Sequence, residues 1–156
     1  MALVTLKIDE LRRQVGQELG ATAWHEVTQA QVDEFADATL DFQWIHTDPQ
    51  LAAASPYGGT IAHGFLTLSL AAWALEQVLE VADATVTINY GLNKVRFPAP
   101  LRTGSSVRVL VSCVAVEDVT GGLQATFAMT FERSDGGKPA CVAEVLIRYG
   151  AKETTT

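Results

Sequence analysis

The stretch from His63 to Glu80 reads HGFLTLSLAAWALEQVLE and carries apolar side chains on nearly every face of a helix. A helix of this composition must be buried almost completely, because no face is left for water. The pair Gly58-Gly59 before it suits a tight turn of the backbone, and Asp83 after it marks the exit toward another element. The sequence therefore predicts one long, central helix over residues 63–80.

Alternating apolar and polar residues fill most of the chain after this helix. Period-two runs cover residues 107–115, 123–131 and 141–149, and a shorter strand-like run covers residues 86–90. Gly-containing turns separate the three long runs, so consecutive strands are predicted to pair as antiparallel hairpins. A long buried helix and an antiparallel sheet together predict an α+β domain in which the sheet wraps the helix, which is the hot-dog arrangement.

A second, shorter helix is predicted to begin at Thr28, because Thr28 and Gln31 have the spacing of a capping box. Apolar residues follow at helical spacing, so this helix should run to about Leu40. Asp41 then begins a different segment.

The composition is that of a globular chain, since 48% of the 156 residues are hydrophobic and 19% are charged. We predict a single domain over residues 1–156, with its core over about 15–150 and a short polar C-terminal tail. The formal charge of −7 argues against a nucleic-acid partner, which would need clustered Lys and Arg. Residues 1–16 lack the apolar region of a signal peptide, and the most apolar stretch, 65–75, is shorter than the ~20 residues that span a bilayer. A cytoplasmic protein without membrane contact is expected.

Asp41 and His46 place a carboxylate and an imidazole five residues apart, ahead of Pro49. Neither regular structure brings them together, because in a helix the side chains would lie roughly 140° apart and in a strand they would face opposite sides. Only an irregular loop can converge them. The alternative is structural, with Asp41 ending the helix in a turn and His46 hydrogen-bonded locally.

Gly64 stands at the start of the predicted central helix, where the first backbone N–H groups have no partner within the helix. These donors and the positive end of the helix dipole suit a carbonyl oxygen that becomes negative during a reaction. The Gly64 N–H is therefore a candidate oxyanion donor, and close helix packing is the alternative. His63 is interpreted as a side chain that caps or braces the turn, and it is not assigned to catalysis.

The spacing Asp-x4-His, followed by GGTIAHGFLTLSL over residues 58–70, closely resembles the MaoC-like dehydratase family. That family includes (R)-specific enoyl-coenzyme A hydratases and nodulation protein N-like proteins, and the resemblance extends from about residue 15 to residue 149. It implies a hot-dog homodimer that binds an acyl thioester in a tunnel near the subunit interface. By motif position, Asp41 and His46 match the catalytic pair, Gly64 matches the oxyanion donor, and Ser69 matches a supporting hydroxyl.

The resemblance implies (R)-specific hydration of a trans-2-enoyl-coenzyme A to an (R)-3-hydroxyacyl-coenzyme A, or the reverse dehydration. Adding water across this double bond needs a base for the water and an acid at C2, and it requires no metal or cofactor. His46 is the leading candidate for the base, and the water is held jointly with Asp41. The stereochemistry comes from the resemblance alone.

Further residues are predicted to support the site or to bind substrate, namely Gln43, Trp44, Asn93, Lys94 and Arg96. Lys94 and Arg96 lie two apart on a predicted strand, so they can share a face and pair with the phosphates of coenzyme A. A solvated strand face is the alternative for both.

No metal site is predicted, because the histidines and aspartates lack a paired-histidine spacing. Cys113 and Cys141 lie in alternating apolar runs and are interpreted as buried thiols rather than a disulfide.

Two other functions remain open from the sequence. A hot-dog thioesterase would direct the activated water to the carbonyl carbon instead of C3, and the order and spacing of the Asp-His pair argue against it. A non-catalytic acyl-thioester-binding or partner subunit would not need Asp41, His46 and Gly64 together. Acyl-chain length, the choice between coenzyme A and acyl carrier protein, and the physiological direction are not determined by the sequence.

Overall fold

The computed structural model describes residues 3–152 of the chain. Its centre is a six-stranded antiparallel sheet in the order β2-β6-β7-β8-β5, with the short β3 also paired to β6. The strands are β2 (Glu18–Ala21), β3 (His25–Glu26), β5 (Val86–Arg96), β6 (Ser106–Val119), β7 (Gly122–Arg133) and β8 (Cys141–Gly150). The predicted hairpins are confirmed, since β6, β7 and β8 pair consecutively in antiparallel register.

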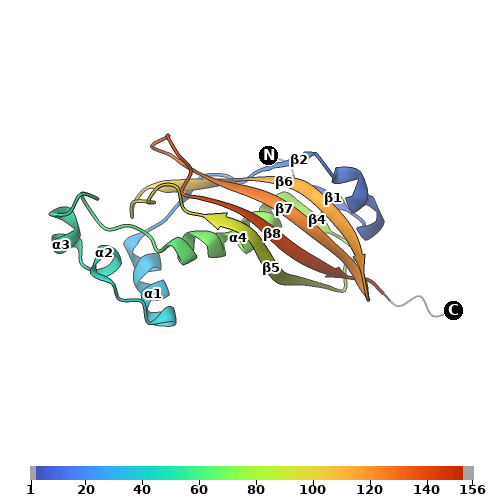
Figure 1. Cartoon of the computed structure of the whole chain (residues 1–156), viewed down its shortest axis with the longest axis horizontal. Coiled ribbons are helices and arrows are strands. Elements are labelled where there is room, and N and C mark those ends of the chain that lie inside the picture. The colour runs from blue at the N-terminus through green and yellow to red at the C-terminus, as the bar shows by residue number, and fades with distance from the viewer. Residues whose placement is uncertain (1–2, 153–156) are drawn as a thin grey trace.

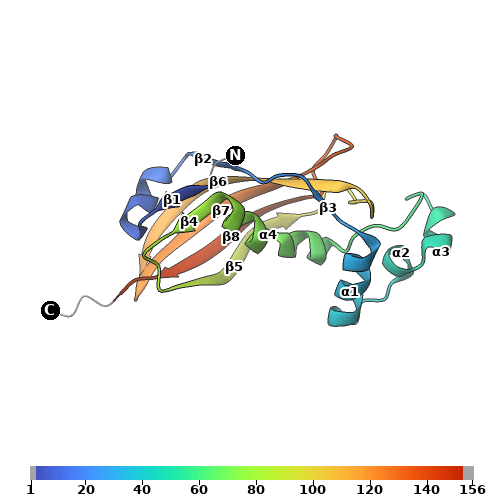
Figure 2. The same cartoon turned by 180° about the vertical axis from the view of Figure 1, so that it is seen from behind.

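The long helix α4 (Gly64–Val78) lies along one face of this sheet, as Figure 1 and Figure 2 show. Its buried side chains pack into the same core as the inward side chains of β6, β7 and β8. The buried apolar residues of the helix are Leu66, Ala71, Ala74, Leu75 and Val78. The predicted α+β arrangement, with a sheet curved over a long central helix, is therefore confirmed.

One stripe of α4 contradicts the prediction of nearly complete burial. Phe65, Ser69, Ala72 and Glu76 are exposed, and their spacing places them on one face of the helix. The sheet covers the helix from one side (Figure 2), so this face is only partly covered by the described residues, with the Phe97 ring 6.3 Å from that of Phe65. Apolar composition indicates that a helix has a buried stripe but does not say how many elements surround it.

The N-terminal segment holds the far end of α4. Strand β1 (Val4–Leu6) pairs in parallel with β4 (Leu79–Val81), which follows α4 directly. A 3-10 helix (Ile8–Gln14) then buries Leu11 in the core. The C-terminal end of α4 is therefore fixed by strand pairing as well as by packing.

Three helices project beyond the end of the sheet, next to the start of α4 (Figure 1). They are α1 (Gln29–Thr39), α2 (Trp44–Thr47) and α3 (Pro49–Ala53). Thr28 Oγ1 accepts a hydrogen bond from the Gln31 N–H at 3.3 Å, and the Gln31 side chain accepts one from the Thr28 N–H at 3.2 Å. The capping box and the start of this helix are as predicted.

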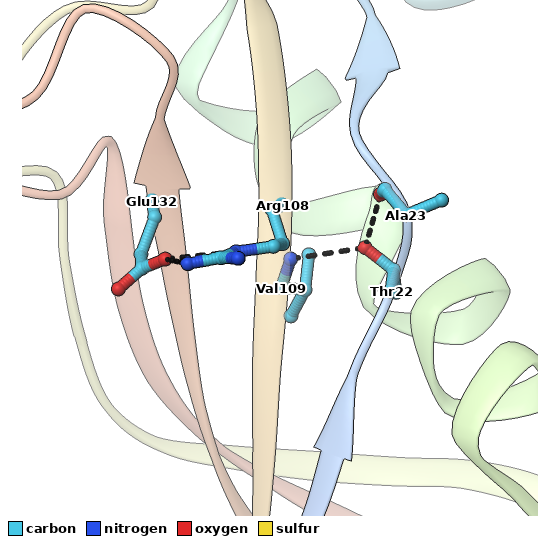
Figure 3. Close-up of polar contacts among 5 residues, drawn as sticks. All are labelled: Thr22, Ala23, Arg108, Val109 and Glu132. Carbon is cyan, nitrogen blue, oxygen red and sulfur yellow. Dashed lines mark hydrogen bonds and ion pairs between the residues drawn. The ribbon is translucent and has the colours of Figure 1, made fainter. Parts of the chain in front are cut away.

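The segment between β2 and β3 is hydrogen-bonded to β6 (Figure 3). Thr22, just after β2, accepts a hydrogen bond from the Val109 N–H at 3.1 Å and donates one to the Ala23 carbonyl at 2.7 Å. Beside it, Arg108 of β6 pairs with Glu132 of β7, with Nε 3.0 Å from Oε2. The Thr22 bond holds this segment on β6, and β3 then pairs with β6 before the chain reaches α1.

Cys113 and Cys141 are buried free thiols, as predicted. Burial raises the pKa of Cys113 and raises that of Cys141 to about 11, so both thiols stay protonated at neutral pH. None of the helices in residues 3–152 has the length and apolar character needed to cross a membrane. The predicted polar tail falls on residues 152–156, of which 153–156 lie outside the described residues.

Candidate active site

Asp41 and His46 meet at the turn between α1 and α2. Leu40 ends α1 with φ of 63°, a left-handed conformation that is uncommon for a residue other than glycine. Asp41 follows with an exposed side chain, and its Oδ1 accepts a long hydrogen bond of 3.4 Å from the Gln43 N–H. His46 stands on α2 and is 6% exposed. The turn brings a carboxylate oxygen of Asp41 within 4.8 Å of a ring nitrogen of His46.

The His46 ring is oriented by a main-chain carbonyl. Its Nδ1 lies 2.7 Å from the Ile61 oxygen, and because a carbonyl can only accept, Nδ1 carries the hydrogen and Nε2 keeps its lone pair. Burial lowers the pKa of His46 and is the largest effect, while the hydrogen bond to Ile61 raises this pKa. His63 lowers this pKa further, and the Asp41 charge raises it. His46 is thus a buried imidazole with Nε2 available as a base.

Gly64 supplies a backbone donor at the first position of α4. His63, the residue before it, caps the helix without a side-chain hydrogen bond, and within the described residues the Gly64 N–H has no acceptor. A Cβ built on Gly64 would meet three atoms of the Phe97 ring at 3.3 Å, so Phe97 packs closely against this glycine. Both interpretations of Gly64 from the sequence, a free donor and close packing, describe features that are present.

His46 and Gly64 open into one cavity of about 360 Å³. Its walls are mostly apolar and include Ile45, Tyr57, Phe97 and Leu101. His46 and Gly64 therefore line one common, mostly apolar space, and electrostatic interactions are stronger in apolar surroundings than in water. Asp41 is not among the lining residues, and its exposed carboxylate lies within 4.8 Å of a ring nitrogen of His46.

Two residues at this site could not be identified as such from the sequence. Gln29 donates from Nε2 to the His46 carbonyl at 2.8 Å, and its Oε1 accepts from the Thr60 hydroxyl at 2.6 Å. His63, which the sequence left as a bracing residue, is stacked on the His46 ring with centroids 3.9 Å apart. The only feature of the sequence that pointed to His63 as a site residue was its place directly before Gly64. For Gln29, the only feature was its position in the first turn of a helix.

The other predicted site residues lie farther from this cavity. Gln43 caps α2 and Trp44 begins it, and both are exposed. Ser69 donates to the Phe65 carbonyl at 2.6 Å and lines a separate cavity of about 280 Å³ between α4 and β5. The structure therefore does not bring the Ser69 hydroxyl to His46.

Asn93, Lys94 and Arg96 are exposed residues of β5. Lys94 has φ of 45°, and the pairing with β8 shifts register between Asn93 and Arg96, so the regular alternation assumed for these cations is interrupted. Lys94 forms an ion pair with Glu144 at 3.6 Å, and Arg96 Nη1 donates to the Val95 carbonyl at 2.7 Å.

Asp41, His46 and His63 have potential metal-ligand atoms within 4.8 Å of one another. The two imidazoles are stacked with an interplanar angle of 25°, so their lone pairs lie in two separate, nearly parallel planes. A tetrahedral ion needs ligands that converge on one point. This geometry does not favour a metal, and the absence of one remains a prediction.

We expect the His46 imidazole to titrate with a midpoint below its usual value of 6.5, because burial disfavours the charged ring. Since the unfolded chain then binds this proton at higher pH than the folded chain, folding stability should fall as pH is lowered through 6.5. Histidine side-chain NMR over pH 4–8 measures the midpoint, and His46→Gln assigns the signal by its loss. A midpoint at or above 6.5 would contradict this account of the site.

Comparisons with known proteins identify the family. The family model of the MaoC like domain matches residues 10–130. The 3-hydroxyacyl-thioester dehydratase Z of Mycobacterium tuberculosis is 50% identical over 145 residues, which cover 92% of this chain and 96% of that protein. Nodulation protein N of Rhizobium leguminosarum bv. viciae is 43% identical over 145 residues, 88% of each chain.

A solved structure agrees with these relatives. The (R)-hydratase from A. caviae involved in PHA biosynthesis superposes with a TM-score of 0.70 at 26% identity, covering 85% of this chain and 94% of that one. The sheet curved over α4 is thus the hot-dog fold predicted from the sequence. The chain belongs to the MaoC-like domain family and is a hydratase/dehydratase.

Proposed function

We propose that this chain adds water to a trans-2-enoyl-coenzyme A with (R) stereochemistry and catalyses the reverse dehydration of the (R)-3-hydroxyacyl thioester. The names of the relatives, a 3-hydroxyacyl-thioester dehydratase and an (R)-hydratase, support this substrate class and stereochemistry. The observation that carries the proposal is that His46 and Gly64 line one cavity, with His46 Nε2 left available by the hydrogen bond at Nδ1 and Gly64 at the first position of α4.

In the hydration direction, a water held by the Asp41 carboxylate and His46 Nε2 gives a proton to His46 while its oxygen bonds to C3. The electrons of the double bond move toward the thioester, and negative charge gathers on the carbonyl oxygen. The Gly64 N–H and the positive end of α4 stabilise that oxygen. His46 then delivers the proton to C2, which completes the addition and restores the base.

Coenzyme A is the proposed carrier of the acyl group. With a formal charge of −7, the chain gains no long-range attraction for an acidic carrier protein. Arg96 is exposed, and most of its guanidinium donors are available to a phosphate. Lys94 is partly engaged by Glu144 and is the weaker candidate.

Loss of either member of the Asp-His pair should abolish most of the hydration. Asp41→Asn and His46→Gln are each expected to lower kcat about 10²–10⁴-fold, because each removes a group that moves or holds the reacting proton. The assay follows the enoyl-thioester absorbance with crotonyl-coenzyme A and a medium-chain 2-enoyl-coenzyme A, and free thiol is measured in parallel. Thiol release without consumption of the double bond would identify a thioesterase, and activity of neither kind would favour a binding subunit.

The backbone donor can be tested by Gly64→Pro with Gly64→Ala as the matched control. Proline lacks an N–H but is tolerated at the first helical position, and His63 before it has the extended conformation that proline requires. Both substitutions place a Cβ against Phe97, and proline in addition removes the N–H and closes a ring whose fixed φ suits the first helical position. We expect Gly64→Pro to lower kcat about 10²–10³-fold relative to Gly64→Ala. Equal rates for the two variants would remove Gly64 from the mechanism.

We also propose that the protein is a homodimer joined at β5. This strand is the last of the sheet and pairs only with β8 among the described strands, so its outer backbone edge is open. Four large apolar side chains of the strand are about half exposed, namely Val86, Ile88, Tyr90 and Leu92. Phe65 on the exposed stripe of α4 is 69% exposed, so a second copy would cover apolar surface on both elements.

Ile88→Glu should break this dimer, because it places a charge in the proposed interface. We expect wild type at twice 16.7 kDa and the variant at 16.7 kDa in sedimentation equilibrium at micromolar concentration. Val114→Glu, at another half-exposed apolar strand position outside β5, is the control and should remain dimeric. A monomeric wild type, or dimeric Ile88→Glu, would refute this interface.

A further inference from the structure

We infer that His63 is a positioning residue, which holds the Asp41 turn and the His46 ring in a fixed relation to the Gly64 amide. The inference rests on the proposed hydratase function and names the residue that assembles its parts. His63 is 2% exposed and directly precedes α4. Its backbone therefore has the position that the packed helix gives it.

The first contact of His63 is with the Asp41 turn. Its Nε2 lies 3.0 Å from the main-chain oxygen of Asp41, so Nε2 carries the hydrogen and donates it to the carbonyl. This bond joins residues 22 positions apart and ties the end of α1 to the start of α4. Leu40, just before the turn, has a sparsely populated conformation that the surrounding structure must maintain. The bond from His63 supplies such a restraint.

The second contact of His63 is with the proposed base. The His63 and His46 rings stack with centroids 3.9 Å apart, so His63 covers one face of the His46 imidazole. The Ile61 carbonyl holds the same imidazole at its Nδ1 edge. A contact on the face and a hydrogen bond at the edge together restrict rotation of His46. The Phe35 ring, 4.9 Å from His63, supports this arrangement from α1.

Packing alone does not explain an imidazole at this position. The Nδ1 atom of His63 is buried and has no hydrogen-bond partner among residues 3–152. A buried polar atom without a partner is destabilising, so an apolar side chain of similar size would serve packing better. The function that such a side chain would lose is the donation from Nε2 to Asp41.

The test compares His63→Gln with His63→Met. The Gln side chain can place an amide N–H where Nε2 of the imidazole stands, whereas Met has a similar length and no donor. We expect His63→Met to lower kcat for crotonyl-coenzyme A about 10–100-fold with KM changed less than about threefold, because small misplacements of catalytic groups act mainly on the chemical step. His63→Gln should exceed His63→Met in kcat by about tenfold or more.

A second readout does not depend on activity. The Asp41 charge raises the pKa of His46, and Asp41 and His63 are the two titratable groups that act on this ring. Asp41→Asn should therefore lower the His46 titration midpoint in an otherwise wild-type chain. The shift should shrink by at least about half in the His63→Met background, where the Asp41 backbone is no longer held, and should persist in the His63→Gln background.

The two readouts separate this inference from the proposed function. If the wild-type chain hydrates no enoyl thioester, the proposed function fails, while the His46 titration still tests how Asp41 is placed. Equal loss of kcat in both His63 variants would overturn the positioning role, since the N–H donor that Gln and His have in common would then make no difference. Lower thermal stability with wild-type kcat in both variants would also overturn it, because the role would be structural only.

Discussion

Burial of α4 against the antiparallel sheet is the interaction on which the site depends. The helix packs its inner stripe among side chains of β6, β7 and β8, and the parallel pairing of β1 with β4 holds its C-terminal end. Close-packed cores resist displacement, so the first turn of the helix has a defined position. His63 and Gly64 lie at this turn. The packed helix therefore positions both the buried His63 ring and the Gly64 N–H.

Two main-chain carbonyl groups then orient the two buried imidazoles. The Ile61 oxygen accepts from Nδ1 of His46, and the Asp41 oxygen accepts from Nε2 of His63. The Ile61 N–H donates to the Ile45 carbonyl at 3.0 Å, so the segment before α4 and the helix α2 bind each other in both directions. Because each carbonyl can only accept, these contacts decide which nitrogen of His46 remains available as a base.

In the proposed mechanism, the different exposure of Asp41 and His46 suits them to different roles. His46 is buried, and desolvation disfavours its charged form, which keeps the neutral base available toward lower pH. Asp41 is exposed beside the turn, where an ionised carboxylate is an acceptor and can orient a water. In the same mechanism, the apolar lining of the cavity would strengthen the interaction between the Gly64 N–H and a developing negative charge.

The sequence by itself determined the longer elements, because their patterns depend on residues within a few positions of one another, whereas the short β1 to β4, the 3-10 helix, α2 and α3 were not predicted. Alternation predicted β6, β7 and β8, the pair Thr28 and Gln31 predicted the start of α1, and an apolar run predicted α4. Only the tertiary structure decided which face of α4 is exposed and which side chains reach the site. His63 meets Asp41 across 22 positions and Gln29 meets Thr60 across 31, and no local pattern encodes such contacts, since they exist only when the elements pack together.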